Sequence, residues 1–145
     1  MLNRILLIIV ITTLTMFTSS AVSKEAKRFD KNIQWKEVVK INFKIGKRDD
    51  ALKIINDHFK PASVKAKTPQ PQLQLEMFTG DYDLLVVWHM EDGINDLTWE
   101  LSPDNIAWRS AFDELAGGKD KAKEILDEYR SYIESVEYDI AMIKP

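Results

Sequence analysis

Cysteine is absent from this chain of 145 residues. A chain without cysteine forms no disulfide, no thiolate nucleophile, no iron–sulfur centre and no cysteine-based zinc site. The fold must therefore be held by its hydrophobic core and its hydrogen bonds. The same absence excludes lipid attachment of the bacterial lipoprotein type, which requires a cysteine after the leader.

Histidine and glycine are also scarce, with two and five residues respectively. The sequence contains no glycine-rich phosphate loop and no Gly-x-Ser-x-Gly nucleophile elbow. His89 and Glu91 share one face of an expected strand, but the sequence offers no clear third ligand, so we predict no metal site. The acidic turn 91–96 lacks the spacing of a calcium loop. His89 is therefore the main candidate for acid–base chemistry, because an imidazole titrates near neutral pH.

Long hydrophobic runs are missing except at the N terminus. Ile5 to Phe17 is a mostly apolar run of 13 residues, and a bilayer needs about 20. A short positive start precedes the run, and small residues around Ala21 to Ser23 follow it. This layout predicts a secretory signal peptide over residues 1–23 and a periplasmic or secreted protein. An uncleaved N-terminal anchor is the alternative; after cleavage we expect no stable membrane anchoring.

The charge balance is slightly acidic. The net charge is −3 for the whole chain, and it becomes −4 without the leader because Arg4 is the one charged residue of 1–23. Nucleic acids and anionic membranes select basic surfaces, so we expect neither as a partner. Residues 24–145 are numerous enough for a single hydrophobic core, and we expect one domain there.

In the first half of this domain, apolar residues recur with two different spacings. Apolar and polar residues alternate over 34–45, which predicts a strand with one buried face. Over 48–60 the period becomes helical, and Pro61 is expected to end that helix. The segment 61–71 holds three prolines and has no period, so we expect an extended loop.

The second half begins with two further alternating segments. They cover 72–79 and 82–91, and the Gly80-Asp81 pair between them predicts a tight hairpin. Residues 92–102 are rich in turn formers and alternate briefly at their end.

Two helices and an ambiguous tail follow. Ser102 is a good helix cap and Pro103 suits a first helical position, while Gly117-Gly118 ends the helix. From Lys119 the spacing predicts a second helix to about Ser135. Residues 136–143 fit both a longer helix and a closing strand, and the fold argument favours the strand.

The element order is strand, helix, hairpin, two helices and a strand. This order is typical of an α+β fold of the ferredoxin-like, split βαβ type, with an antiparallel sheet and helices on one face. The other face of the sheet stays bare unless something covers it.

Strand parity places His89 on that bare face. In 82–91 one side is wholly apolar and must pack on the helices; the other side carries His89 with Leu85 and Val87. The polar sides of the other strands are expected to join His89. They contribute Lys40, Asn42 and Lys44 from the first strand and Gln72, Gln74, Glu76 and Phe78 from the second.

Such a surface can bind a small polar or aromatic molecule, because it combines apolar walls with a few hydrogen-bonding groups. We predict His89 as the catalytic acid–base residue. Lys40, Asn42, Gln74 and Glu76 are the predicted ligand-binding residues. The alternative is an ordinary solvated sheet face with the same alternation and no function.

The segments KINFKIGKRDDALKIINDHF, GDYDLLVVWHME and AWRSAFDELAGG resemble the dimeric α+β barrel superfamily over roughly 35–143. That superfamily includes the antibiotic-biosynthesis monooxygenase, NIPSNAP and Dabb families. The resemblance implies a homodimer in which two sheets pair face to face and enclose a lumen that holds the binding or catalytic site. It implies Asn42 and His89 as lumen residues of a cofactor-independent monooxygenase.

The resemblance does not extend to the haem-degrading members. These use a histidine on the second helix, and the segment 103–116 has none, so we expect no haem and no other cofactor.

Two functions stay open. The first is an exported small-molecule-binding protein or cofactor-independent enzyme that uses proton-transfer chemistry, such as isomerisation or monooxygenation, on the polar sheet face. The second is a non-enzymatic accessory or interaction protein of an exported pathway, with a link to glycans. It would use the loop 61–71 and Trp99, the one tryptophan outside the core patterns.

Overall fold

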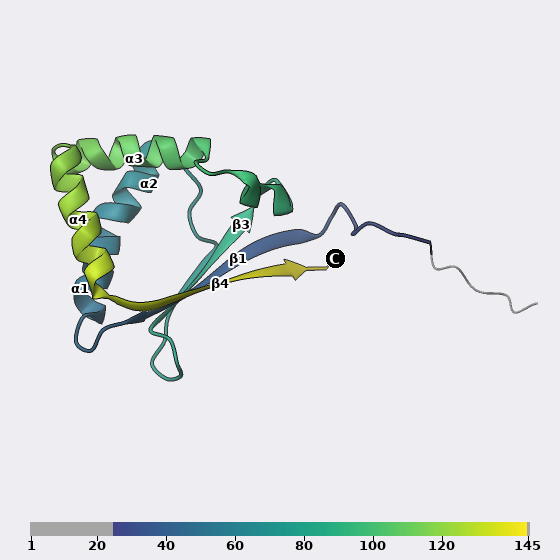
Figure 1. The fold of residues 1–145 in the computed structure, drawn as a ribbon, viewed down its shortest axis with the longest axis horizontal. Helices are drawn as coiled ribbons and strands as arrows, with labels where there is room; N and C mark the ends of the chain where they lie inside the picture. Colours follow the sequence, from purple (N-terminus) through teal and green to yellow (C-terminus); the bar gives the residue numbers. More distant parts are fainter. Residues whose placement is uncertain (1–24, 145) are drawn as a thin grey trace, which may run out of the picture.

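The computed structural model describes residues 25–144, and the predicted signal peptide lies outside them. Four strands form one antiparallel sheet, and helices cover one of its faces (Figure 1). The predicted ferredoxin-like α+β fold is confirmed. Within this described part of the chain, no helix is long and apolar enough to cross a membrane.

The sheet has the order β2-β3-β1-β4. Its strands are β1 (Gln34–Phe43), β2 (Leu73–Glu76), β3 (Leu84–Met90) and β4 (Ile133–Ile143). The central strand β1 pairs with β3 on one side and along its whole length with β4 on the other. The closing strand is therefore confirmed, and it begins at Ile133, three residues before the predicted start at 136.

The first helix is longer than predicted. α1 (Arg48–Ile54), the π-helix η1 (Ile55–Phe59) and α2 (Lys60–Ala66) follow one another without a break. The prediction that Pro61 ends the helix is wrong. In the wide turn η1 the Lys60 N–H donates to the Ile55 carbonyl. This i→i−5 bonding shifts the carbonyls that a proline ring would meet in a regular helix, so the helix continues.

The predictions of a long loop over 61–71 and of a tight hairpin at Gly80-Asp81 are also wrong. Most of 61–71 belongs to α2, and the left-handed Lys67 (φ 56°) ends that helix. The strands β2 and β3 do pair antiparallel, but residues 77–83 connect them as a wider loop than a two-residue turn. Residues 93–98 form a short 3-10 helix, η2 (Gly93–Thr98), in the stretch that was predicted to be rich in turns.

The two later helices form as predicted. They are α3 (Pro103–Ala116) and α4 (Lys119–Tyr132). The Ser102 Oγ accepts a hydrogen bond from the Asn105 N–H at 3.1 Å and so caps α3. Gly117 takes the left-handed conformation (φ 86°) that ends α3.

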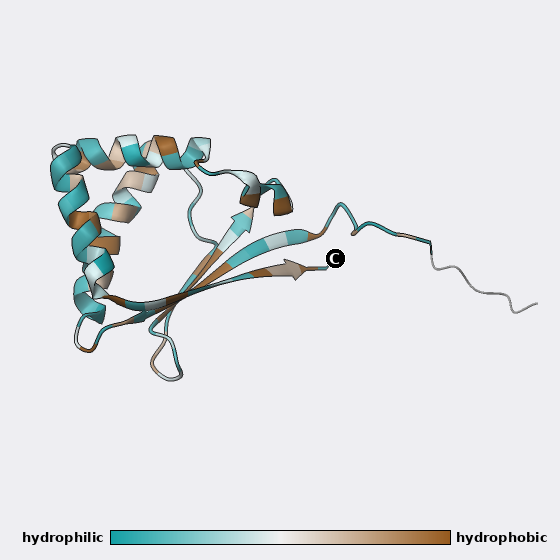
Figure 2. Ribbon diagram, in the orientation of Figure 1, coloured by the Kyte–Doolittle hydropathy of each residue, from teal (hydrophilic) through white to brown (hydrophobic). Residues whose placement is uncertain are grey.

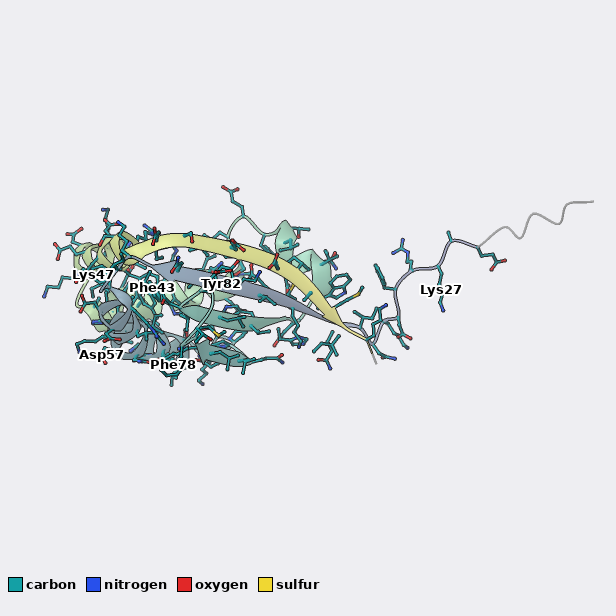
Figure 3. The ribbon with its side chains drawn as sticks, turned by 90° about the horizontal axis from the view of Figure 1, so that it is seen from below. Lys27, Phe43, Lys47, Asp57, Phe78 and Tyr82 are labelled. Atoms are coloured by element: carbon teal, nitrogen blue, oxygen red, sulfur yellow. The ribbon has the colours of Figure 1, made fainter. Side chains whose placement is uncertain are left out.

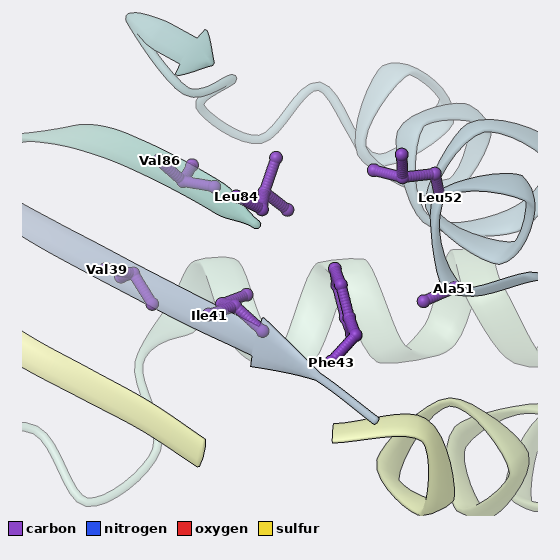
Figure 4. Close-up of a cluster of buried hydrophobic side chains, with 7 residues drawn as sticks. All are labelled: Val39, Ile41, Phe43, Ala51, Leu52, Leu84 and Val86. Carbon is purple, nitrogen blue, oxygen red and sulfur yellow. The ribbon is translucent and has the colours of Figure 1, made fainter. Parts of the chain in front are cut away.

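The core lies between the sheet and the helices. One buried cluster joins β1 and β3 to α1 (Figure 4), and its members are Val39, Ile41, Phe43, Ala51, Leu52, Leu84 and Val86. A second cluster joins α2, α3 and α4 around Phe112, which stacks on Trp108 with ring centroids 5.0 Å apart. Colouring by hydropathy shows mixed apolar and polar bands on the same strands and helices (Figure 2).

The helices cover only part of the sheet. β1 and β4 extend well beyond them (Figure 1). On the edge strand β4, Tyr138 is 66% exposed and Met142 is 37% exposed. The sheet therefore offers uncovered surface on both sides at this end.

Candidate functional site

The sheet face opposite the helices, called the uncovered face below, is defined by cross-strand neighbours. Neighbours in a ladder point to the same side of a sheet. The register pairs Lys36 with His89, Val38 with Val87, and Lys40 with Leu85. Leu73 and Leu75 of β2 pair with Val87 and Leu85 and lie on the same side. Figure 3 views the molecule from below, with β1 and β4 running across the view.

His89 lies on the uncovered face, where strand parity placed it. Its ring is half-buried, and Nδ1 lies 3.1 Å from the Lys36 amine. The same amine donates to the Gln72 Oε1 at 2.6 Å. Lys36, Gln72 and His89 therefore form a polar group, the Lys36 triad, at one end of an otherwise aliphatic surface.

The amine of this triad has unusual surroundings. Lys36 is only 3% exposed, and lysines are rarely so buried without a carboxylate partner. No carboxylate of residues 25–144 forms an ion pair with it. Within this part of the chain the amine contacts an amide oxygen and an imidazole nitrogen in place of a carboxylate.

The contact with Lys36 sets the tautomer of His89. An ammonium group has donors only, so the Nδ1 of His89 must be the acceptor. In the neutral ring the proton then lies on Nε2. No hydrogen-bond partner of this nitrogen lies among residues 25–144, so it can donate to a ligand. The geometry thus favours His89 as a donor to an oxygen of the ligand.

Lys40 and Asn42 lie on the uncovered face but not beside His89. Lys40 is four residues from the triad lysine along β1, a distance of about 13 Å. Its amine contacts Asp139 at 2.6 Å and lies over the Tyr82 ring. The hydrogen bond to Asp139 raises the pKa of Lys40. Lys40 is thus already paired within the protein.

Gln74 and Glu76 are on the opposite side of the sheet, and the prediction that they share a face with His89 is wrong. They pair with Val86 and Leu84, which face the helices. Gln74 borders an apolar cavity of about 160 Å³ beneath the helices. The Glu76 carboxylate lies 3.5 Å from the Arg48 guanidinium on α1.

Two members of the triad were missed as site residues from sequence. Lys36 shares the parity of Lys40, and an antiparallel pairing of the strands 34–45 and 82–91 can bring it opposite His89. The register itself cannot be read from the alternation. Gln72 was grouped with the polar face, and its contact with Lys36 depends on the irregular pairing at the start of β2, where its N–H donates to the Val87 carbonyl.

Metal binding finds no support in the described residues. Between residues 25 and 144, no three His, Asp or Glu side chains gather in a way that could hold an ion.

Tyr129 lies beneath the helices, and burial raises its pKa to about 12, so it is a neutral phenol in the core.

Solved structures with a similar fold are NIPSNAP proteins. A NIPSNAP family protein of unknown function from Agrobacterium tumefaciens aligns with 76% of this chain and 87% of its own, at 16% identity and a TM-score of 0.50. A NIPSNAP domain protein from Burkholderia xenovorans aligns with 76% of this chain and 94% of its own, at 15% identity and a TM-score of 0.46.

The first similarity shows a common fold and confirms the resemblance at that level. No protein-family model and no curated protein matches the chain. The homodimer and the ligand therefore remain predictions.

Proposed function

We propose that this protein binds a small molecule on the uncovered face, in a lumen closed by a second copy of the chain. The observation that carries the proposal is the Lys36 triad. A buried amine without a counter-ion and a histidine Nε2–H next to an aliphatic surface suit a ligand with an apolar body and an electron-rich oxygen.

The aliphatic surface supports the apolar part of that ligand. Val38, Leu85 and Val87 line its middle, and Leu73 and Leu75 line its edge. The leucines of β2 are 45% and 43% exposed in the single chain. Exposed apolar side chains in such a group are typical of a surface that a partner covers. A second sheet would bury them and enclose the ligand.

The chemistry that suits this site is stabilisation of an oxyanion. A ligand bound as a carboxylate, phenolate or enolate would accept the hydrogen bond from Nε2 of His89, and the Lys36 ammonium would stabilise the charge through the ring. Isomerisation and cofactor-independent oxygenation begin when the substrate loses a proton to give an enolate or phenolate. Solvent would take that proton, and His89 with its protonated Nε2 would stabilise the resulting anion. Lys36 and Gln72 would act as positioning residues, since they act through His89.

The location of this activity follows from the N-terminal prediction. The signal peptide over 1–23 would direct the protein to the periplasm or outside the cell. The ligand would then be a small molecule that is present in the periplasm or outside the cell.

The accessory-protein alternative has less support. It rested on an extended loop at 61–71 and on Trp99. Most of that segment is helix α2, so the surface offered to a protein partner is reduced to residues 67–72. Trp99 keeps its exposure, 56%, and we consider it separately below.

Native mass spectrometry of the protein purified gently from its host tests the proposal first. It reports the subunit number and any retained molecule together. A dimer that carries an acidic or carbonyl-containing molecule would support the proposal. A monomer would refute the lumen. An empty dimer would move the test to ligand screening by thermal shift with aromatic and aliphatic acids.

Variants then locate the site. His89→Gln and Lys36→Met should each weaken binding by about tenfold, the usual effect of losing a hydrogen bond to a charged group. The matched controls are His58→Gln on η1 and Lys121→Met on α4, which lie in the helix layer. Equal effects in the variants and their controls would contradict the assignment of the triad.

A further inference from the structure

A cleft of about 800 Å³ lies on the helix side of the sheet, and it touches the Lys36 triad only at His89. Its lining residues come from β1 and β3, from η1, α2 and residues 68–69, from η2 with the loop that follows it, and from the start of α3. Its volume is in the range of sites that hold small molecules.

Aromatic side chains from separate elements line this cleft. Trp88 comes from β3, Trp99 from the loop after η2, and Trp108 from α3. The Trp108 ring is fixed, because its Nε1 donates to the Phe59 carbonyl at 3.3 Å and it stacks on Phe112. Trp99 is 56% exposed, which is unusual because tryptophan side chains are highly buried on average. Part of its indole ring is therefore open to a ligand.

The charges of the cleft have one sign. Five carboxylates line it, and their residues are Glu37, Glu91, Asp92, Asp96 and Asp104. Its lining includes no lysine or arginine and one histidine, His89. None of the five carboxylates forms an ion pair within the described part of the chain. The cleft therefore carries negative charge that the fold leaves uncompensated.

Glu37 is the carboxylate that lies deepest among apolar neighbours. It occupies the middle of β1 on the helix side, between Trp88 on β3 and Ile140 on β4. Burial raises its pKa. An apolar side chain here would extend the core pattern of Val39 and Ile41, so the carboxylate opposes stability at this position.

We propose that this cleft binds a small organic cation, either an alkylamine or a quaternary ammonium compound. The cation would place its charge near Glu37 and its alkyl groups against the indole rings. Tryptophan faces attract such cations, and nearby carboxylates add to the attraction. A neutral sugar would also stack on the indoles, but it would gain nothing from the uncompensated charge. The cation is therefore the better fit.

Calorimetric titration of the purified protein tests the charge requirement. The probes are choline, tetramethylammonium and spermidine, and 3,3-dimethylbutan-1-ol is the neutral isostere of choline. We expect at least one cation to bind at least tenfold more tightly than the isostere. Maltotriose and cellotriose report the sugar alternative.

Variants assign the binding to the cleft. Glu37→Gln should weaken cation binding about tenfold, and Trp99→Ala about threefold. Glu124→Gln on α4 and Phe78→Ala in the 77–83 loop are matched controls on exposed sites and should leave binding unchanged. Circular dichroism confirms that each variant is folded.

Three results would overturn the proposal. The first is the absence of any cation that binds better than the isostere. The second is oligosaccharide binding that Trp99→Ala weakens and Glu37→Gln does not. The third is cation binding that the controls weaken as much as the cleft variants do. Lys36→Met separates this site from the triad, because Lys36 does not line the cleft and its loss should weaken binding of the acidic ligand but not of the cation.

Discussion

The two faces of the sheet are built by alternate residues of the same strands, yet their surroundings differ. Leu84 faces the helices and is 1% exposed, while the next residue, Leu85, faces away from them and is half-buried. The helix side is closed by the protein itself at its core end. The uncovered face has a similar aliphatic content, but nothing in residues 25–144 covers it (Figure 1). Residues that face the helices are therefore expected to determine the stability of the fold. Their neighbours on the uncovered face are expected to determine binding.

The largest effect should come from truncating the helix side. Leu84→Ala removes a fully buried side chain from the core cluster and should lower the free energy of unfolding by about 3 kcal/mol. Leu85→Ala should cost less than about 1 kcal/mol within one protomer. Urea unfolding at low protein concentration measures both. Equal losses would show that both faces are packed within one chain.

A charge on the uncovered face should break the proposed dimer. Val87→Lys puts an ammonium group at the centre of the aliphatic surface and should raise the dimer dissociation constant about a hundredfold. Val64→Lys changes a valine that is 69% exposed on α2 and serves as the control. Sedimentation velocity over a concentration series measures the shift. A wild-type monomer at all concentrations would contradict the dimer.

The strands and most helices could be predicted because each has its own period. Alternation, however, groups residues by side without saying which side meets the helices. In β2 the apolar residues Leu73 and Leu75 were expected on the core side, and they face away from it. The placement depends on the pairing with β3 and on what finally covers each face. The latter is a tertiary property, which a local pattern does not contain.

The helix through Pro61 illustrates a second limit. Proline is a reliable helix breaker only when the preceding turn is regular. In a regular helix the proline ring clashes with the carbonyl four residues earlier, and the π turn η1 relieves this clash. The sequence of 55–59 has no pattern that predicts a π turn. The site has a similar limit: parity gave the side on which His89 lies, but the register decided that Lys36 would be its partner and that Lys40 would pair with Asp139.

A smaller effect is expected at the residue just before β3, whose side chain contacts the end of β1. The Asp83 carboxylate accepts a hydrogen bond from the Phe43 N–H at 2.8 Å in a partly buried position. Asp83→Ala leaves that N–H without its partner and should cost about 1.5 kcal/mol. Asp139→Ala on exposed β4 breaks the contact with Lys40 and should cost clearly less, because an exposed ion pair adds little to stability. Thermal unfolding at neutral pH compares them, and a larger loss for Asp139→Ala would contradict the expected order.

The smallest effect is a pH dependence at Glu37, on the helix side of β1. Burial raises its pKa above the ordinary value of 4.5. The folded state then holds the proton more tightly than the unfolded state, so stability falls as pH rises through the window that begins near 4.5. Glu37→Gln should therefore be the more stable protein at pH 7. The gain should be of the order of 0.5 kcal/mol, because water screens this half-buried carboxylate.

The pH profile tests the cause of that gain. Below the ordinary pKa both proteins carry a neutral side chain at position 37, so their melting temperatures should converge in scans from pH 7 down to pH 3.5. A gain that persists unchanged at low pH would point to packing. The same substitution is expected to weaken cation binding. A variant that is both more stable and a poorer binder is the combination expected where a fold keeps a charge for a ligand at the expense of its own stability.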